Sequence, residues 1–408
     1  MPPKVIPIQP VSSTKSGIYL HFPYCLQKCH YCDFFSVGLD ELPGADFSER
    51  LRLYEESLNR EMEIRAADPD FASQHFDSIY FGGGTSSMMP PEMIERILFR
   101  LKELFSVDSP AEITLEGNPE NLVPEYLEAL SNLGINRVNS GLQTYNSNFL
   151  KDMNRFFDTQ RYAGLLEALT ACSIPSVGVD LIYGFHGQTY EEFARDLEKV
   201  LRYRIQHLSV YSLTVEPETR YARHINRGSQ GAPNEGLQEK VFSNLPGLLK
   251  DKGFHQYEIS NYSAIGEICK HNWKYWDYRP YLGLGPGAHG FNGQIRYANP
   301  RNLNAWTSSP GRAQSSEEHN PIIDLFLNIF RITVPIRLDR ITEIWDQQSW
   351  TEKDRNSRWS ALINSLEKMD RENLGILKKE TFQWSLAGLQ LLDTQIERLV
   401  EATLQPEQ

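Results

Sequence analysis

The stretch that decides the fold is IYLHFPYCLQKCHYCDFFS, residues 18–36. An apolar, strand-like run leads into three cysteines, Cys25, Cys29 and Cys32, at the spacing C-x3-C-x2-C. Three thiolates this close on one loop can bind three irons of a 4Fe–4S cluster. The fourth iron then has no protein ligand, so it can take a small chelating molecule.

Zinc and disulfides are the alternatives for these cysteines. A structural zinc site usually has two well-separated ligand pairs, and no C-x2-C pair follows, although His21 or His30 could complete a site. The chain has five cysteines, an odd number, and we expect no secretory signal, which disfavours disulfides. The other two, Cys172 and Cys269, have no partner at metal-ligand spacing and are interpreted as small buried hydrophobes.

Composition narrows the class of protein. A chain of 408 residues, 40% hydrophobic and 23% charged, predicts two or three globular domains. The net charge of -12 argues against nucleic-acid binding and against broad contact with anionic membranes. No uninterrupted apolar stretch reaches the ~18 residues of a membrane span, so we expect at most peripheral membrane contact. Free cysteines and an oxygen-sensitive cluster favour the cytoplasm.

Strand-like and helix-like segments alternate after the cysteine loop. The strand-like segments that follow residues 18–20 are 78–81, 112–116, 137–142, 176–183 and 207–215. The helical segments are 46–67, 91–105, 122–133, 162–169 and 190–201. This alternation indicates right-handed βαβ units and a parallel sheet. The predicted fold class is α/β, a partial (β/α)6 barrel whose active site lies at the carboxyl ends of the strands.

Composition also predicts the domain boundaries. We expect a flexible tail at residues 1–16, the partial barrel at 17–250 and an aromatic-rich and glycine-rich extension at 251–311. Beyond residue 312 the sequence becomes helical and charged, which predicts a smaller, mostly helical domain at 312–408 that could include a small sheet.

Polar residues and glycines stand where the strands of this barrel end. Glycines at 82–84 followed by Thr85 let a ligand approach the backbone, although a plain tight turn is the alternative. Glu116 ends the third strand and Gln143 follows the fourth. Arg155 lies in the helix entry after the fourth strand, and Asp180 lies inside an otherwise apolar strand. Each could be a satisfied structural group, but together at one barrel mouth they suit a ligand with ribose hydroxyls and an ammonium group.

The most distinctive stretch is HNWKYWDYRPYLGLGPGAHG, residues 271–290. An exposed His271 among aromatics could face a flat apolar ligand such as a porphyrin, or ligate its iron. The alternative is that the aromatics cap the open side of the barrel and His271 is hydrogen-bonded inside.

These motifs, in this order, resemble the HemN/HemW branch of the radical S-adenosylmethionine (SAM) superfamily. The oxidases of that branch carry a fourth cysteine two positions after the third, whereas Asp33 and Phe34 follow Cys32 here. They also have a longer N-terminal segment, whereas 24 residues precede Cys25 here. The H-N-x-x-Y-W block from His271 to Trp276 is typical of the HemW heme chaperones, so the sequence most resembles that family.

The resemblance implies a protein that binds heme, carries a 4Fe–4S cluster and SAM, and delivers heme to client hemoproteins. It implies cluster ligands at Cys25, Cys29 and Cys32, and a heme-associated residue at His271. The residues implied at SAM sites are Tyr19, Tyr31, Gly83, Gly84, Thr85, Glu116, Gln143, Arg155 and Asp180. A homodimer is left open, as is any enzymatic activity.

The sequence departs from the family at a few positions and leaves two enzymatic alternatives. Ser86 and His186 stand where proline is common, and Phe156 and Phe157 follow Arg155 where a histidine is usual. An oxygen-independent coproporphyrinogen III oxidase is the main alternative, and the missing fourth cysteine disfavours it. A radical methyltransferase that opens the heme ring is the other.

Overall fold

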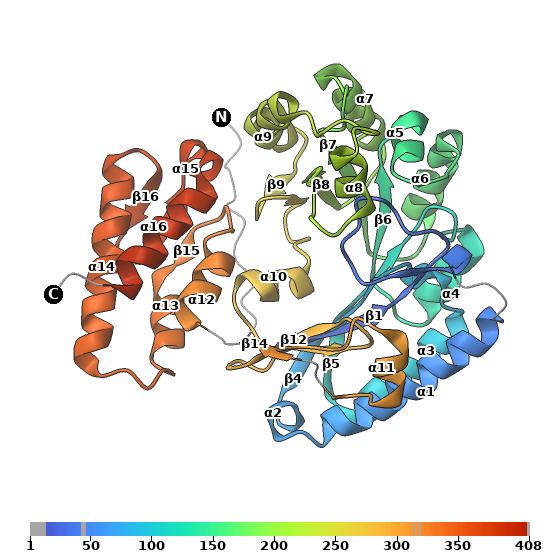
Figure 1. The fold of residues 1–408 in the computed structure, drawn as a ribbon, viewed down its shortest axis with the longest axis horizontal. Coiled ribbons are helices and arrows are strands. Elements are labelled where there is room, and N and C mark those ends of the chain that lie inside the picture. The colour runs from blue at the N-terminus through green and yellow to red at the C-terminus, as the bar shows by residue number, and fades with distance from the viewer. Residues whose placement is uncertain (1–13, 42–45, 313–314, 318–319, 406–408) are drawn as a thin grey trace.

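The computed structural model describes residues 14–41, 46–312, 315–317 and 320–405. Within these residues, no helix combines the length and the apolar character that crossing a bilayer requires. Figure 1 shows a barrel of strands and helices with the helices α12–α16 gathered on one side of it. Of the predicted tail, residues 1–13 lie outside the described residues, and Ser16 already belongs to the first strand.

Parallel strands in chain order form the centre of the barrel. The strands are β1 (Ser16–Phe22), β4 (His75–Gly83), β5 (Ser106–Gly117), β6 (Arg137–Gln143), β7 (Ser176–Tyr183) and β8 (His207–Ser212). Each pairs in parallel with the next, as right-handed βαβ units require. The predicted partial (β/α)6 barrel is therefore confirmed.

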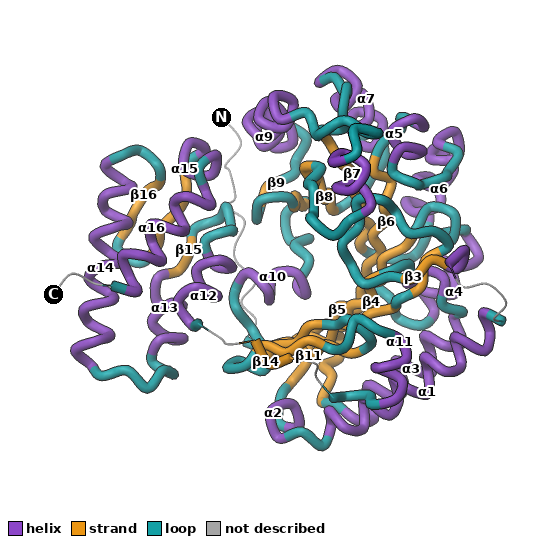
Figure 2. The backbone as a smooth tube through the Cα atoms, in the orientation of Figure 1, coloured by secondary structure: helices purple, strands orange, loops and turns teal. Residues whose placement is uncertain are grey.

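Helices cover the outer face of this sheet (Figure 2). The longer ones are α1 (Phe47–Ala66), α3 (Pro91–Leu104), α4 (Pro124–Asn132), α6 (Tyr162–Ala171), α7 (Tyr190–Val200) and α9 (Glu235–Lys250). The shorter ones are α2 (Pro69–Ala72), α5 (Ser147–Asp152) and α8 (Arg220–Asn226). Capping side chains fix the first residues of two of these helices: Asp46 caps α1, and Thr189 and Glu192 form a capping box on α7. Their apolar stripes join the strands in one core.

Further strands extend the sheet at both edges. At the β1 edge they are β11 (Tyr281–Leu284), β12 (His289–Phe291), β13 (Arg296–Ala298) and β14 (Ser315–Glu317). The helix α11 (Leu303–Ser308) lies between β13 and β14 in the chain, outside the sheet. At the β8 edge they are β10 (Asn261–Ser263) and β9 (His255–Gln256). The strand expected at 254–260 is thus largely wrong, because only two of its residues, His255 and Gln256, pair in the barrel sheet. β8 likewise ends before residue 215, since the chain leaves the sheet after Ser212.

The helix α10 (Lys270–Trp276) lies where the strands begin, opposite the cysteine loop. Glu112 on β5 accepts hydrogen bonds from the amides of Lys270 and His271, at 3.0 and 2.9 Å. It also forms an ion pair with Arg137 at 3.2 Å. Lys274 pairs with Asp77 beside the first residues of β4. The H-N-x-x-Y-W block is therefore a helix that buried charges anchor to the barrel floor, the end of the barrel where the strands begin.

The chain ends in a smaller, mostly helical unit, as the sequence predicts. Its helices are α12 (Pro321–Ile329), α13 (Leu338–Trp345), α14 (Glu352–Arg371), α15 (Leu386–Gln390) and α16 (Leu392–Leu404). Its small sheet has the order β15 (Ile336–Arg337), β17 (Thr381–Trp384), β16 (Gly375–Lys378). The predicted boundaries at 17, 251 and 312 stay predictions, and β14, just beyond the last, still pairs in the barrel sheet.

Candidate functional site

The cysteine loop follows β1 at the carboxyl end of the barrel strands. A short parallel pair, β2 (Tyr24–Cys25) with β3 (Val37–Gly38), closes the loop on itself. The amide of Cys32 donates to the carbonyl of Cys29 at 3.3 Å, and that of His30 donates to Met153 at 2.9 Å. The loop is therefore held at both its base and its tip.

The glycine loop after β4 packs directly against the cysteine loop. The amides of Gly84 and Thr85 donate to the carbonyls of Phe22 and Tyr24, at 2.6 and 2.8 Å. A Cβ at Gly84 would lie 2.6 Å from the Tyr24 carbonyl oxygen, so only glycine fits there. Gly83 has a φ of +107°, and a Cβ on it would meet the His21 ring at 2.8 Å. The glycines thus bring the two loops together. The amides of Gly84 and Thr85 serve this contact between the loops.

The three cysteine thiols line the same cavity. Burial, together with charge on Cys29 and Cys25, raises the pKa of Cys32 to about 12. Burial also raises the pKa of Cys25. These thiols keep their protons until a metal arrives, so metal binding there releases protons. Arg155 Nη1 lies 3.9 Å from Cys29 Sγ.

The described residues offer no group of three or more His, Cys, Asp and Glu that could hold a single metal ion. A cubane needs a different arrangement, because each cysteine binds its own iron. The histidines considered for zinc are engaged elsewhere. His21 Nε2 lies 2.7 Å from the Phe35 carbonyl oxygen and its Nδ1 3.1 Å from the Tyr19 hydroxyl, while His30 Nδ1 lies 3.1 Å from the Asp152 carbonyl oxygen.

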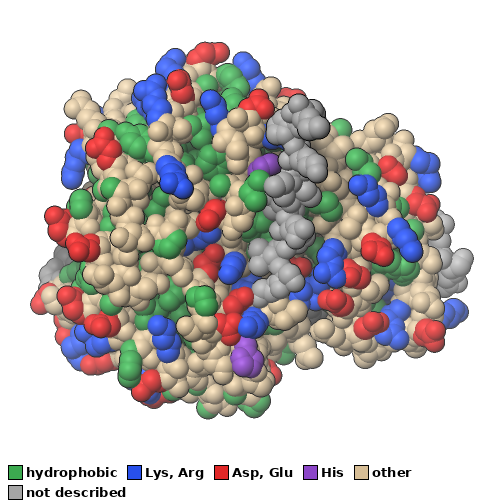
Figure 3. Space-filling view, turned by 180° about the vertical axis from the view of Figure 1, so that it is seen from behind, with side chains coloured by type: hydrophobic (Ala, Val, Ile, Leu, Met, Phe, Trp, Pro, Cys, Tyr) green, Lys and Arg blue, Asp and Glu red, His purple; other side chains and the backbone are tan. Residues whose placement is uncertain are grey.

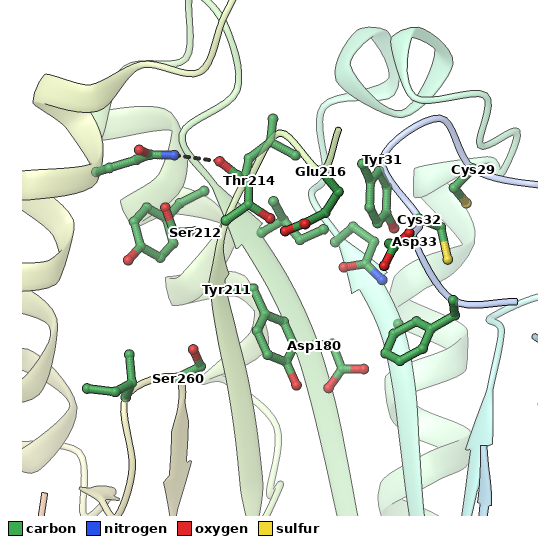
Figure 4. Close-up of a pocket in the computed structure, with 18 of the residues that line it drawn as sticks. Cys29, Tyr31, Cys32, Asp33, Asp180, Tyr211, Ser212, Thr214, Glu216 and Ser260 are labelled. Atoms are coloured by element: carbon green, nitrogen blue, oxygen red, sulfur yellow. Dashed lines mark hydrogen bonds between the residues drawn. The ribbon is translucent and has the colours of Figure 1, made fainter. Parts of the chain in front are cut away.

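A cavity of about 1520 Å³ begins at the cysteine loop and runs across the carboxyl ends of β4–β8 to α15 and α16. Sites for one small molecule typically measure ~300–1,000 Å³. In Figure 4, Asp180 and Tyr211 point into the space between the cysteine loop and Ser260. The cavity is therefore large enough for more than one ligand.

Two half-buried carboxyl groups, those of Glu116 and Asp180, line the cavity near the glycine loop. Burial raises the pKa of Glu116 to about 7, although a 2.5 Å hydrogen bond from the Tyr80 hydroxyl opposes the shift. Burial likewise raises the pKa of Asp180 to about 6, opposed by a hydrogen bond from Ser209. Each is thus poised to ionise when a cationic ligand arrives.

Unpartnered polar atoms lie beside these carboxyl groups. Asp180 Oδ1, Gln143 Oε1, Asn139 Oδ1 and Arg155 Nε are buried without a hydrogen-bond partner, and all four residues line the cavity. Buried polar atoms are normally paired, so these atoms indicate a polar ligand. Arg155 Nη2 itself donates to the Gly141 carbonyl and to Asn118 Oδ1. We define the polar compartment as Glu116, Asn118, Asn139, Gln143, Arg155 and Asp180.

Most of the residues predicted for the site meet in this cavity, but two do not. The residues that line it are Cys25, Cys29, Tyr31, Cys32, Gly83, Gly84, Thr85, Glu116, Gln143, Arg155 and Asp180. Tyr19 and His271 lie below, inside the barrel. Asn118 and Asn139 were missed, although Asn118 stands two residues after Glu116 in the motif TLEGNP.

His271 is fully buried, so the expectation of an exposed histidine is wrong. Its Nδ1 lies 3.0 Å from Ser78 Oγ and its Nε2 lies 3.0 Å from the Tyr275 hydroxyl. A Cβ at Gly17 would stand 2.8 Å from the ring, so glycine makes room for it. The alternative, a histidine hydrogen-bonded inside the barrel, describes this geometry. A role in heme binding stays a prediction, and it requires His271 to lose its hydrogen bond with Ser78 or with Tyr275.

The two cysteines outside the loop are structural. Cys269 is buried, and its thiol lies 3.6 Å from Glu112 Oε1. Cys172 is half-buried, and its thiol donates to the Leu169 carbonyl at 3.0 Å. Neither lines the cavity.

The fold and the cysteine site define the class of protein. Residues 19–200 match the family described as "Radical SAM superfamily". The oxygen-independent coproporphyrinogen III oxidase HemN from Escherichia coli, a radical SAM enzyme, has a similar structure, with a TM-score of 0.74. At 20% identity over 96% of this chain and 90% of HemN, that likeness shows the fold alone.

Proteins similar in sequence show which family within this class the chain belongs to. The chain is 32% identical over 299 residues to "Heme chaperone HemW" of Mycobacterium tuberculosis, covering 73% of this chain and 75% of the relative. It is 33% identical over 284 residues to the Lactococcus lactis protein of that name, covering 70% and 72%. The mouse "Radical S-adenosyl methionine domain-containing protein 1, mitochondrial" is 32% identical, covering 68% and 61%. The chain therefore belongs to the HemW family.

Proposed function

We propose that this protein is a heme chaperone, which binds heme and transfers it to client hemoproteins while carrying a 4Fe–4S cluster and SAM. One observation carries the proposal: in a member of the HemW family, the cysteine loop opens on a 1520 Å³ cavity that continues well beyond it. Heme is flat, apolar and poorly soluble, so a protein that moves it through water must shield it in such a space.

Cys25, Cys29 and Cys32 would hold the cluster and leave one iron open. SAM would chelate that iron through its amino and carboxylate groups and, on reduction of the cluster, could supply a deoxyadenosyl radical. Glu116 and Asp180 would bind the positive charge of SAM, and Gln143 and Arg155 would pair the unpartnered atoms of the polar compartment. Tyr31, Gly83, Gly84 and Thr85 would line the same site, with Tyr19 supporting it from inside the barrel.

Coproporphyrinogen III oxidase activity is the function to exclude. Asp33 and Phe34 follow Cys32 where the oxidases have their fourth cysteine, and both side chains line the cavity. We expect the reconstituted protein, supplied with SAM and reductant, to leave coproporphyrinogen III unchanged. Formation of protoporphyrinogen IX would replace the chaperone proposal with the oxidase.

Anaerobic reconstitution with iron, sulfide, SAM, hemin and an apo-hemoprotein acceptor tests the proposal. Absorbance follows heme from this protein to the acceptor, and chromatography detects any deoxyadenosine. We expect stable heme binding followed by transfer that is faster than from free hemin. A protein that fails to bind heme, or holds it without transfer to several acceptors, is not a chaperone.

The cellular setting is part of the same proposal. Free thiols at all five cysteines support the cytoplasm. On the face shown in Figure 3, acidic and basic side chains are interspersed, and the net charge of -12 also supports the absence of nucleic-acid binding. Homodimer formation and peripheral membrane contact stay predictions, which light scattering and vesicle sedimentation test.

A further inference from the structure

We propose that heme binds in the half of the cavity remote from the cysteine loop, between the barrel and the C-terminal helices, with Arg331 pairing a heme propionate. We define this distal compartment as Tyr211, Phe242, Ile259, Arg331, Leu389 and Leu391, all of which line the cavity. The inference rests on the proposed function, because it names the place where the cargo would lie.

Apolar side chains stand on both walls of the distal compartment. Tyr211 lies near the end of β8, Phe242 lies on α9 and Ile259 follows β9, so these three come from the barrel. Leu389 and Leu391 face them from α15 and from the turn between α15 and α16. Leu391 is 51% exposed and Tyr211 is 39% exposed. Large apolar side chains exposed on opposite walls of one cavity suit a flat apolar ligand that covers both.

The two compartments differ in chemistry, which separates their ligands. The polar compartment carries the half-buried carboxyl groups and unpartnered atoms that suit SAM, and it adjoins the cysteine loop. The distal compartment carries four apolar side chains, the phenol of Tyr211 and one arginine, while polar side chains such as Gln238, Glu239 and Gln390 also line the cavity from the same helices. A cavity of 1520 Å³ has room for both ligands together.

Arg331 is placed to bind a carboxylate at the edge of the distal compartment. It follows α12, and its neighbour Ile332 forms a β-bridge with Glu258 at the junction between the barrel and the C-terminal unit. Its Nη2 donates to Asp393 Oδ1 at 2.9 Å and its Nε to the Leu327 carbonyl at 3.2 Å.

The pair of Arg331 with Asp393 can be exchanged at little cost. The Asp393 side chain is 79% exposed, and such surface ion pairs contribute little to stability. A propionate can therefore take the place of Asp393, and the planar guanidinium suits a carboxylate in a bidentate geometry.

The described residues that line the cavity include no histidine and no methionine. Among the residues of the distal compartment, the phenol of Tyr211 is the side chain that can ligate heme iron. Binding would depend on apolar contact and on the propionate, so an acceptor with a histidine ligand can withdraw the heme. This is the property that a chaperone needs.

A hemin titration of the cluster-loaded and SAM-loaded protein, with matched pairs of variants, tests the site. Arg331→Gln should weaken hemin binding about tenfold, the expected loss of a hydrogen bond to a charged group. Its control is Arg355→Gln, which removes another arginine of the same unit that is likewise 33% exposed and paired to an aspartate. Leu391→Glu should weaken hemin binding by a similar factor, because it places a carboxylate against an apolar ligand. Its control is Ile376→Glu, at a side chain that is 53% exposed on β16.

A second ligand isolates the propionate. Hemin dimethyl ester has no carboxylate, so the wild type and Arg331→Gln should bind it equally. If Arg331→Gln loses the same factor in affinity for hemin and for hemin dimethyl ester, Arg331 does not bind a propionate.

The outcomes separate the site from the function. A wild type that does not bind hemin overturns the chaperone proposal itself. If Arg331→Gln and Leu391→Glu bind hemin as tightly as the wild type does, only the distal site is wrong. Low-spin spectra typical of histidine ligation would also contradict the site.

Discussion

His271 packs against Tyr80 with ring centroids 5.1 Å apart and the ring planes tilted by 30°, and the Tyr80 hydroxyl donates a hydrogen bond to Glu116 at 2.5 Å. The helix α10 on the barrel floor and the polar compartment at the barrel mouth therefore share one intervening side chain. Changes at His271 can reach the cavity through Tyr80 without any contact between His271 and a ligand.

Replacing His271 with alanine should lower the free energy of unfolding by about 1–3 kcal/mol, because Ser78 and Tyr275 lose a buried hydrogen-bond partner. Urea denaturation measures the change. His75→Ala is the control, since His75 is an exposed histidine on the same strand as Ser78. Hemin titration of the folded variant tests the predicted heme role: weaker binding supports it, and an unchanged affinity removes it.

Replacing Cys29 with alanine should abolish the cluster, because two thiolates cannot hold three irons. Iron and sulfide analysis, with the absorbance near 400 nm, measures the loss. Cys172→Ala is the matched control, because its thiol is also half-buried but lies outside the cavity. Full iron and sulfide content in Cys29→Ala would disprove the ligand set.

SAM affinity should depend on pH through Glu116 and Asp180. Their pKa values are raised to about 7 and about 6, so both are largely ionised at pH 8, whereas at pH 6 Glu116 is largely protonated and Asp180 is about half protonated. Protonation removes the charge that attracts SAM, so affinity should fall about tenfold from pH 8 to pH 6.

Anaerobic calorimetry of the cluster-loaded protein measures this dependence, with cluster absorbance recorded at each pH. Glu116→Gln should bind SAM weakly and show a shallower pH profile. A wild-type affinity that is constant over this range would contradict the assignment of these carboxylates to SAM.

Replacing Glu112 with alanine should destabilise the protein by about 3–5 kcal/mol, because the buried Arg137 loses its carboxylate partner at 3.2 Å and keeps only the more distant Glu267 carboxylate, at 3.9 Å. It also removes the acceptor for the first amides of α10. Urea denaturation measures the change, and Glu198→Ala, whose side chain is 70% exposed in its pair with Arg202, is the control. Equal stability of the two variants would mean that Glu112 does not anchor α10.

The sequence predicted the barrel well because the signals for it are local. The strand 176–183 was predicted with its observed bounds, since an apolar run between turns is a property of neighbouring residues. Asp180 and Glu116 were predicted to meet because parallel strands bring their carboxyl ends to one edge. The strand expected at 254–260 failed because pairing at a sheet edge depends on a partner distant in sequence.

By itself, the sequence determined the cysteine spacing, the order of βα units, the family and most of the polar compartment. The burial of His271 and the place of Arg331 were decided only by tertiary structure. Ser78 and His271 are 193 residues apart, and Arg331 reaches the cavity only because the C-terminal helices pack across the barrel mouth. Periodicity and spacing are set by adjacent residues, whereas the surroundings of a side chain are set by every segment that packs around it.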